Sequence, residues 1–317
     1  MKKIVIITGA TSGIGRASAA QFAKESYKVI IACRNEALGL ETAQALNNLY
    51  GTDVVTMMQV DMSSLESIRS FCNRYQDVYD KLDVLIHNAG CFNHGVKVYQ
   101  QSVDGLELTF ATNVFGPFLM SILLKEQLKK SGNGVIVGVA STNMQHFFDL
   151  KRKIDFEDLE GSMQSSKTYD SYKMYGDSKM ALSMLLLRMG ELFKEEQIRV
   201  NAVMISGTKI SKKRIEAFPS YWRVLAHCQN LFSRSQEYMA NNYYLLCEAP
   251  EFKNVTGQII SGTGKLIEKA SEKMSELTIL KDGLIHSYYY PIYTENQSEV
   301  EKLWELCSKV TKRYIEF

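Results

Sequence analysis

Short apolar runs alternate along the chain with longer segments in which apolar positions recur at helical spacing. Six runs are largely apolar, and most are rich in Val and Ile, as in strands buried on both faces of a sheet. They cover residues 3–8, 28–33, 53–60, 83–87, 134–140 and 199–204. Helical patterns separate them, so the chain predicts an α/β fold: a doubly wound parallel sheet covered by helices.

The tail of the chain after Gly264 has a different pattern. Residues 266–277 are charge-rich with helical character, and 288–291 are expected to be extended at a turn. From 298 to 314, apolar residues recur at roughly helical spacing, which predicts an amphipathic helix. We expect this helix to pack on the body of the protein or to reach a partner subunit.

Composition excludes several functional classes. With 317 residues and 45% hydrophobic content, the chain can bury a substantial core. The net charge is +2 with scattered Lys and Arg, which gives no sign of nucleic-acid binding. The six cysteines lack metal-ligand spacing, and no apolar stretch is long enough to span a bilayer. We therefore expect a cytoplasmic protein with reduced thiols, no metal and no membrane span.

A glycine-rich turn follows the first strand at once. Its sequence, Gly9-Ala10-Thr11-Ser12-Gly13-Ile14-Gly15, leads into a predicted helix at 16–24. Glycine lets phosphates approach the backbone closely, and the start of a helix offers free N–H groups and a positive dipole. Strand, glycine turn and helix in this order predict a dinucleotide site. An ordinary strand-to-helix turn is the alternative.

The end of the second strand bears on the choice of dinucleotide. Folds that bind NAD usually place an acid there for the ribose hydroxyls, but this chain has Cys33 followed by Arg34. A guanidinium suits a 2′-phosphate through paired, charge-assisted hydrogen bonds. We therefore expect NADP(H) in preference to NAD(H). The alternative is a solvent-facing arginine, with the specificity set elsewhere.

Polar and small residues stand at the ends of three later strands and inside one helix. Asp61 follows the third strand, where it can accept from an adenine amine or cap the next helix. Asn88-Ala89-Gly90 follows the fourth strand, and small residues there let the backbone lie against a cofactor. Ser141 ends the fifth strand, at the edge where open α/β sheets bind ligands. Asn113 lies in an apolar helix expected from about Ser102, so it needs a partner or a task.

Tyr175 and Lys179 supply proton-transfer chemistry. Lys179 lies one helical turn beyond Tyr175 on the same face, so its ammonium can reach the phenol. A free phenol titrates near 10, too high for efficient catalysis at neutral pH, and a nearby positive charge lowers that pKa. Beside a dinucleotide, the pair predicts proton donation to a carbonyl as hydride arrives from a nicotinamide. An exposed Tyr–Lys pair on a helix is the alternative.

Together these motifs make the chain resemble a short-chain dehydrogenase/reductase. The resemblance covers nearly all of the chain and rests on Thr8 to Gly15, Asp61, Asn88-Ala89-Gly90, Asn113, Ser141 and Tyr175-x-x-x-Lys179. Within the family the chain is most similar to retinol dehydrogenase-like members, through Ala32-Cys33-Arg34-Asn35, Val103-Asp104-Gly105-Leu106-Glu107, Ile154-Asp155-Phe156-Glu157-Asp158-Leu159 and Leu303-Trp304-Glu305-Leu306. Protochlorophyllide reductase shares some of these, including Asp177-Ser178-Lys179.

The resemblance implies roles for particular residues in a Rossmann fold. Tyr175 would be the general acid, Lys179 would also hold the nicotinamide ribose, Ser141 would polarise the carbonyl, and Asn113 would position a proton-relay water. The implied cofactor site comprises Gly9, Thr11, Ser12, Gly13, Ile14, Gly15, Arg34, Asp61, Met62, Asn88, Ala89, Gly90, Tyr175, Lys179, Gly207 and Thr208. The family usually has Pro-Gly after the sixth strand, where this chain has Ser206-Gly207-Thr208. Gly207 keeps the backbone freedom, and Thr208 can still face the carboxamide.

The resemblance also points to a substrate-binding region at about 208–233. This region is rich in aromatic residues, and the stretch between Ser141 and Tyr175 is long enough to add a lip over the site. An apolar lining favours a lipophilic aldehyde or ketone, whereas core or dimer packing is the alternative for these aromatics. The candidate substrate-binding residues are Phe92, Phe147, Tyr172 and Trp222.

The sequence as a whole predicts an NADPH-dependent reductase of a lipophilic or aromatic carbonyl compound. One alternative is reduction of an activated C=C bond, in an enone or a tetrapyrrole-like molecule, by the same site. Another is a non-catalytic NADP(H)-binding sensor or interaction protein, against which the four intact catalytic candidates argue. We expect a single domain at 1–264, with an extension at 265–317 packed on it, and leave a homodimer open.

Overall fold

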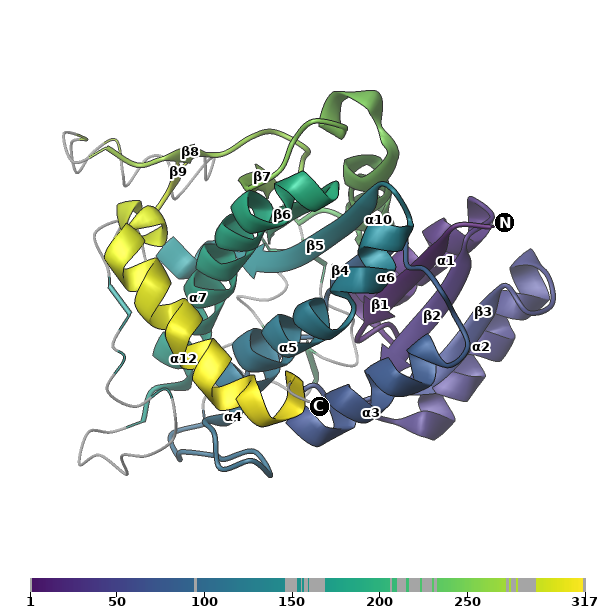
Figure 1. The fold of residues 1–317 in the computed structure, drawn as a ribbon, viewed down its shortest axis with the longest axis horizontal. Helices are drawn as coiled ribbons and strands as arrows, with labels where there is room; N and C mark the ends of the chain where they lie inside the picture. The colour runs from purple at the N-terminus through teal and green to yellow at the C-terminus, as the bar shows by residue number, and fades with distance from the viewer. Residues whose placement is uncertain are drawn as a thin grey trace.

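Seven parallel strands form the central sheet of the computed structural model, in the order β3-β2-β1-β4-β5-β6-β7 (Figure 1). They are β1 Ile4–Thr8, β2 Lys28–Cys33, β3 Val55–Gln59, β4 Val84–His87, β5 Gly134–Ser141, β6 Ile198–Ile205 and β7 Gln258–Ser261. The structure describes residues 2–93, 96–145, 153–154, 156, 159, 169–205, 207–209, 215–216, 223, 230, 233–271, 274, 278 and 289–315. The doubly wound parallel sheet is confirmed, and β7 is a strand that the apolar pattern did not reveal.

Helices cover both faces of the sheet (Figure 1). One face packs against α1 Gly13–Lys24, α2 Glu36–Tyr50 and α10 Gln236–Glu248. The other packs against α3 Leu65–Gln76, α5 Gly116–Leu123, α6 Lys125–Lys130, α7 Ser171–Leu192 and α12 Gln297–Ile315. The shorter elements are α4 Leu108–Phe110, the π-helix η1 Ala111–Phe115, and the 3₁₀ helices η2 Thr142–Gln145, η4 Lys194–Glu196, η5 Pro250–Phe252 and η6 Ile292–Glu295.

The strand order creates a crevice at one edge of the sheet. The chain runs outward through β1, β2 and β3, then returns to place β4 on the other side of β1. The connections after β1 and β4 therefore leave in opposite directions, and a crevice opens between them at the carboxyl ends of the strands. The glycine turn follows β1 and Asn88-Ala89-Gly90 follows β4, so both motifs meet there.

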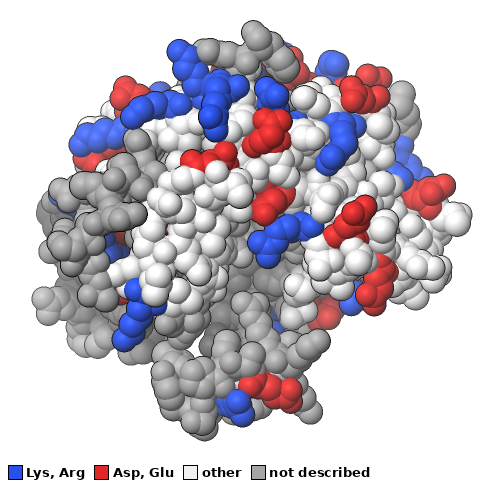
Figure 2. All heavy atoms as spheres, turned by 90° about the horizontal axis from the view of Figure 1, so that it is seen from below, with Lys and Arg blue, Asp and Glu red and all other residues white. Residues whose placement is uncertain are grey.

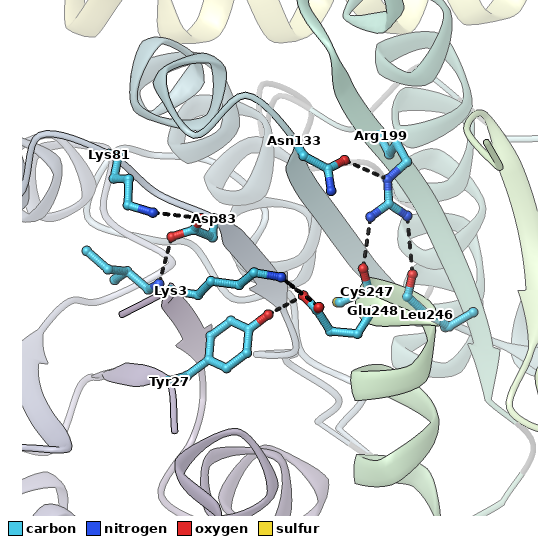
Figure 3. A network of polar contacts seen from close by, with 10 residues as sticks. Lys3, Tyr27, Lys81, Asp83, Asn133, Arg199, Leu246, Cys247 and Glu248 are labelled. Atoms are coloured by element: carbon cyan, nitrogen blue, oxygen red, sulfur yellow. Dashed lines mark hydrogen bonds and ion pairs between the residues drawn. The ribbon is translucent and has the colours of Figure 1, made fainter. Parts of the chain in front are cut away.

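A polar network at the opposite edge of the sheet anchors α10 (Figure 3). The buried guanidinium of Arg199 donates to the carbonyls of Leu246, Cys247 and Phe252, at 3.4, 2.8 and 2.9 Å. Lys3 pairs with Glu248 at 2.6 Å in the same network. A cation at the carboxyl end of a helix satisfies carbonyls that the helix leaves unpaired. The far end of α10 is thereby fixed, which sets its first turn beside the crevice.

The helix expected from about Ser102 begins later in the structure. Gln101 forms an antiparallel bridge with Glu107, and the amide of Ser102 donates to the carbonyl of Leu106 at 2.8 Å. Gly105 closes this turn with a φ of +77°, a value that glycine adopts easily. Residues 101–107 therefore form a closed turn, and α4 starts only at Leu108 before widening into η1.

The tail contains a strand where helical character was expected. Glu268–Lys269 forms β8, which pairs in parallel with β9, Tyr289–Tyr290, so the helical assignment is wrong at this point. The extended segment expected at 288–291 is confirmed where the structure describes it, at β9. The amphipathic helix is also confirmed as α12, which packs on α5 and α7. Trp304 meets Phe118 edge to face, with ring centroids 5.1 Å apart.

We predict that Leu303→Ala lowers the free energy of unfolding by about 2–5 kcal/mol, because Leu303 lies on the inner side of α12 and is fully buried. Urea or thermal denaturation would measure the change. Glu305→Ala, on the exposed side of the same helix, is the control and should stay within about 0.5 kcal/mol of the wild type. Equal stabilities for Leu303→Ala and the wild type would mean that α12 does not pack as described.

Candidate active site

A cleft of about 1740 Å³ opens at the carboxyl edge of the sheet. Its lining brings together nearly all the described residues that the sequence nominated: Gly9, Thr11, Ser12, Gly13, Ile14, Gly15, Arg34, Asp61, Met62, Asn88, Ala89, Gly90, Phe92, Ser141, Tyr172, Tyr175, Lys179, Gly207 and Thr208. Asn113 is buried directly behind this wall, and Phe147 and Trp222 lie outside the described residues. Segments far apart in sequence thus converge on one cavity.

Among the described residues, the rest of the surface offers no stronger candidate. Acidic and basic side chains are mixed on the face shown in Figure 2, without a field of one sign. In the described part of the chain, no helix combines the length and apolar character needed to cross a bilayer. Nor do three or more His, Cys, Asp or Glu side chains gather there as metal ligands. The cleft is therefore the main candidate for a functional site.

The glycine turn has the space that a phosphate needs. Gly9 has a φ of +66°, and a Cβ there would lie 2.9 Å from Cα of Ala89, so only glycine fits this close approach. Gly13 also has a positive φ, of +57°, yet a Cβ on it would meet nothing within 4 Å. The first turn of α1 therefore faces open space, and the Ser12 side chain makes no capping bond to its N–H groups.

Thr8 joins the two loops that form the floor of the cleft. Its hydroxyl accepts from the backbone amides of Asn88 and Ala89, at 3.0 and 2.9 Å. In return, the side-chain amide of Asn88 donates to the carbonyl of Thr8 at 2.9 Å. The sequence marked the small residues of this loop but assigned no task to Thr8. Its partners lie about 80 residues away, so local pattern could not reveal them.

The residues expected near an adenosine line the cleft beyond the glycine turn. Arg34 is exposed just after β2. Asp61 does not cap the next helix, because its carboxylate accepts from the amide and hydroxyl of Ser63, at 2.9 and 2.7 Å. The N-cap of α3 is Ser64, whose hydroxyl accepts from the amide of Ser67. The capping alternative for Asp61 is therefore wrong, while Asp61 and Met62 do line the cleft.

Lys179 brings a buried cation to Tyr175. Its Nζ donates to the carbonyl of Val139 at 2.7 Å and lies 5.7 Å from the centre of the Tyr175 ring. Burial lowers the pKa of Lys179 from 10.5 to about 8. Behind it, burial and then the Lys179 charge lower the pKa of His87 to about 3, so this histidine is neutral. Near neutral pH the cation beside Tyr175 is therefore Lys179, whereas His87 is uncharged.

The side-chain amide of Asn113 is engaged on both of its atoms. Oδ1 accepts from the amide of Cys91 at 2.7 Å, and Nδ2 donates to the Cys91 carbonyl and to Oγ of Ser178, each at 3.0 Å. Ser178 in turn donates to the carbonyl of Tyr175 at 2.8 Å. Asn113 therefore joins the loop after β4 to the helix that carries Tyr175. The sequence missed the part played by Ser178, although it stands beside Lys179.

Ser141 lines the same cleft as Tyr175, and an aromatic ring packs on the phenol. Ser141 ends β5, and its hydroxyl contacts the amide and side chain of Asn143 at 3.2 and 3.4 Å. Phe92 stacks on the Tyr175 ring, with centroids 4.4 Å apart and planes 21° apart. Tyr172 meets Phe92 edge to face at 5.8 Å. One side of the phenol is therefore lined by apolar rings.

Comparison with known proteins gives the family. Retinol dehydrogenase 14 from Mus musculus is 31% identical over 268 residues, which cover 81% of this chain and 76% of the relative. The profile of the family described as short chain dehydrogenase matches residues 3–149. The chain belongs to the short-chain dehydrogenase family. The resemblance inferred from the motifs is confirmed, and the protein is an oxidoreductase.

Other relatives of this short-chain dehydrogenase agree in sequence and in fold. Retinol dehydrogenase 12 from Mus musculus is 36% identical over 179 residues, 56% of this chain and 53% of the relative. A solved short chain dehydrogenase from Salmonella enterica serovar Typhi superposes with a TM-score of 0.64 at 21% identity, covering 83% of this chain and 96% of the other. The latter likeness confirms the predicted Rossmann fold.

We predict that Lys179→Met makes this short-chain dehydrogenase more stable at pH 7. A fall in the lysine pKa from 10.5 to about 8 corresponds to roughly 3 kcal/mol that burial of the charge costs, and losing the charge-assisted bond to Val139 offsets about 1.5–3 kcal/mol of that cost. The unfolded chain binds more protons between pH 8 and 10.5, so this cost is complete below pH 8 and disappears toward pH 10.5.

Thermal denaturation of the cofactor-free protein at pH 7 and pH 10 would measure this effect. The variant should be more stable by up to about 1.5 kcal/mol at pH 7, and the advantage should narrow at pH 10. Lys253→Met removes an exposed lysine and serves as the control. A destabilised Lys179→Met variant at pH 7 would show that the buried charge is not costly here.

Proposed function

We propose that the protein is an NADP(H)-dependent reductase of a carbonyl group in a lipophilic or aromatic small molecule. The observation that carries this proposal is the position of Tyr175 in the cleft wall, with the buried ammonium of Lys179 below its ring. The glycine turn and Arg34 in the same cleft support the cofactor. Family membership gives the reaction class, and the residue roles below are proposals.

The cleft residues fit an NADP(H) molecule. The open space at Gly13 and the free first turn of α1 suit a pyrophosphate. Arg34 would bind the 2′-phosphate, Asp61 the adenine amine, and Lys179 the nicotinamide ribose, with Gly207 and Thr208 beside the carboxamide. Relatives in fold support this choice, since one from Escherichia coli CFT073 is described as complexed with NADPH. When bound, the nicotinamide supplies the hydride.

The side chains around the reacting carbonyl have separate roles in proton transfer and polarisation. Tyr175 donates its phenolic proton to the carbonyl oxygen, and the Lys179 ammonium stabilises the phenolate that remains. Ser141 donates a hydrogen bond to the same oxygen and polarises it. We assign Asn113 to a proton-relay water through its backbone carbonyl, because its side chain is already bonded to Cys91 and Ser178. Above about pH 8 the ammonium charge is lost and this support weakens.

The substrate class follows from the rings beside Tyr175. Phe92 and Tyr172 form an apolar wall against which a flat or lipophilic carbonyl compound packs. The relatives described as retinol dehydrogenases support a lipophilic substrate. Phe147 and Trp222 stay predictions for the same pocket. The cytoplasmic location, the homodimer and the domain boundary at 264 also stay predictions.

Arg34→Ala should raise the KM for NADPH about 10- to 100-fold and leave the KM for NADH nearly unchanged. Hydrogen bonds to a charged group contribute roughly 1.5–3 kcal/mol each, which corresponds to this range. Steady-state kinetics with both cofactors would measure it. Lys253→Ala, which removes an exposed cation outside the cleft, is the control. A variant that keeps its preference for NADPH would rule out Arg34 as the 2′-phosphate ligand.

Tyr175→Phe should lower kcat about 10²- to 10⁴-fold, because it removes the general acid. The assay mixes the protein with NADPH and a panel of aldehydes, ketones and enones, and follows cofactor absorbance. NADPH binding, measured by fluorescence, should stay within about threefold of the wild type. Tyr238→Phe, at a half-exposed tyrosine on α10, is the control for loss of a phenol.

Each outcome of that assay has a definite meaning. Turnover of carbonyls that depends on Tyr175 supports the proposed reductase. Consumption of NADPH with enones alone, with a saturated ketone as product, would indicate a C=C reductase. NADPH binding without turnover of any compound would favour a sensor or interaction protein. Undiminished turnover in Tyr175→Phe would refute the role of this residue.

A further inference from the structure

Glu107 is a buried carboxylate that the proposed chemistry does not use. Its side chain is fully buried, and no ion pair to it occurs among the described residues. Burying a carboxylate without a cation is costly unless hydrogen bonds satisfy its oxygens. Such a residue therefore needs a structural or functional reason.

The two carboxylate oxygens of Glu107 bond to different segments, each of which leads into a helix that carries a proposed catalytic residue. Oε2 accepts from the backbone amide of Phe110 at 2.7 Å and so caps α4, which leads into the π-helix carrying Asn113. Oε1 accepts from the phenol of Tyr169, also at 2.7 Å. Tyr169 directly precedes Asp170, the N-cap of the helix that carries Tyr175. One carboxylate thus joins the starts of the two helices.

The chemistry of a carboxylate suits this double contact. Both of its oxygens accept, and bonds to an ionised acceptor are roughly twice as strong as neutral ones. In glutamine only the carbonyl oxygen accepts, so a variant that keeps the cap on Phe110 can meet Tyr169 only through its amide N–H, in a neutral bond that is weaker and runs in the opposite direction. Burial and then the Glu107 charge raise the pKa of Tyr169, so its phenol stays protonated and keeps donating.

The helix that carries Asn113 depends on such anchors. α4, η1 and α5 follow one another without a break over residues 108–123, and the five-residue π-helix η1 is a widened turn inside this helix, a form that is rare without support from its surroundings. A second contact joins the same elements nearer the reaction centre, where Asn113 donates to Ser178 at 3.0 Å. Two separated contacts fix both the distance and the angle between two elements, whereas one contact allows rotation about it.

We propose that Glu107 is a positioning residue, which through Tyr169 sets the placement of Asn113 relative to Tyr175. This inference rests on the proposed reductase, because it concerns the geometry of that site. Glu107 touches neither substrate nor cofactor and acts through the two helices. Its loss should therefore lower the rate of the chemical step more than the binding of either reactant.

Asp104 provides a matched control from the same turn. It is also a carboxylate that joins separate elements: it accepts from the amide of Leu65 at 2.8 Å and from the phenol of Tyr314 at 3.0 Å, and it pairs with Arg313 at 3.5 Å. These contacts lead to α3 and to the end of α12, away from Tyr175. Asp104→Asn should therefore reduce stability without disturbing the alignment of Asn113 and Tyr175.

The test compares Tyr169→Phe, Glu107→Gln and Asp104→Asn in the full-length protein, with thermal stability and steady-state kinetics for each. We expect kcat to fall about tenfold or more in Tyr169→Phe and by a smaller factor in Glu107→Gln, with KM for NADPH and for the carbonyl within about twofold of the wild type in both variants. Asp104→Asn should keep kcat within about twofold of the wild type, even if its melting temperature falls as much as that of Tyr169→Phe. Unchanged kcat in Tyr169→Phe, or an equal fall in Asp104→Asn, would overturn the proposal.

Glu107→Asp separates the two contacts of the carboxylate. A shorter side chain can still cap α4, since aspartate is a good N-cap, but it no longer reaches Tyr169. We expect this variant to behave like Tyr169→Phe. Kinetics equal to those of the wild type would show that capping of α4 is sufficient for full kcat and that the contact to Tyr169 is not needed.

Amide hydrogen exchange keeps the inference testable if the wild type turns over no compound, an outcome that would defeat the proposed reductase itself. In Tyr169→Phe, segments 108–116 and 171–180 should both exchange faster than in the wild type. In Asp104→Asn, faster exchange should be confined to the start of α3 and the end of α12. Unchanged exchange at 108–116 and 171–180 in Tyr169→Phe would refute the link.

Discussion

The buried ammonium of Lys179 constrains the structure around the cleft. A charge inside a protein must be met by oriented dipoles, and the carbonyl of Val139 lies 2.7 Å from it. That contact fixes the spacing between β5, which ends at Ser141, and α7, which carries Tyr175. The Val139 carbonyl is held in place because β5 lies in the buried core of the sheet. The Lys179 ammonium is therefore fixed in position, and the other side chains of the site lie around it.

Polar groups next to this cation are satisfied mainly by one another. Asn113 bonds to Cys91 and Ser178, and Glu107 bonds to Phe110 and Tyr169. Such networks hold reactive groups in place before any ligand arrives, which reduces the reorganisation needed during reaction. Their disadvantage is that each member depends on partners in other segments. The site therefore requires the complete fold and could not form from α7 alone.

Much of this organisation could be predicted from local sequence. The β-branched runs gave the sheet, and fixed motif spacings gave the glycine turn, Asn113, Ser141 and the Tyr175–Lys179 pair. The start of α4 was predicted too early, although Asp104-Gly105 is a local turn signal that marks the closed turn. The strand at 268–269 depends on pairing with 289–290. The partners of Thr8 and Asn113, and the Tyr169 partner of Glu107, lie 22 to 81 residues away. Contacts over such separations have no periodic signature in the chain.

The position of α12 also affects how the protein is made. This helix buries Leu303 and Cys307 in the core cluster that includes α5 and α7, and its Tyr314 bonds to Asp104, 210 residues earlier. Ribosomal synthesis proceeds at roughly 5–20 residues per second, so α5 and α7 emerge many seconds before their cover. During that interval the apolar faces of α5 and α7 are exposed, so they can bind chaperones or aggregate. Final closure of the core must therefore wait until residues 297–315 have left the ribosome.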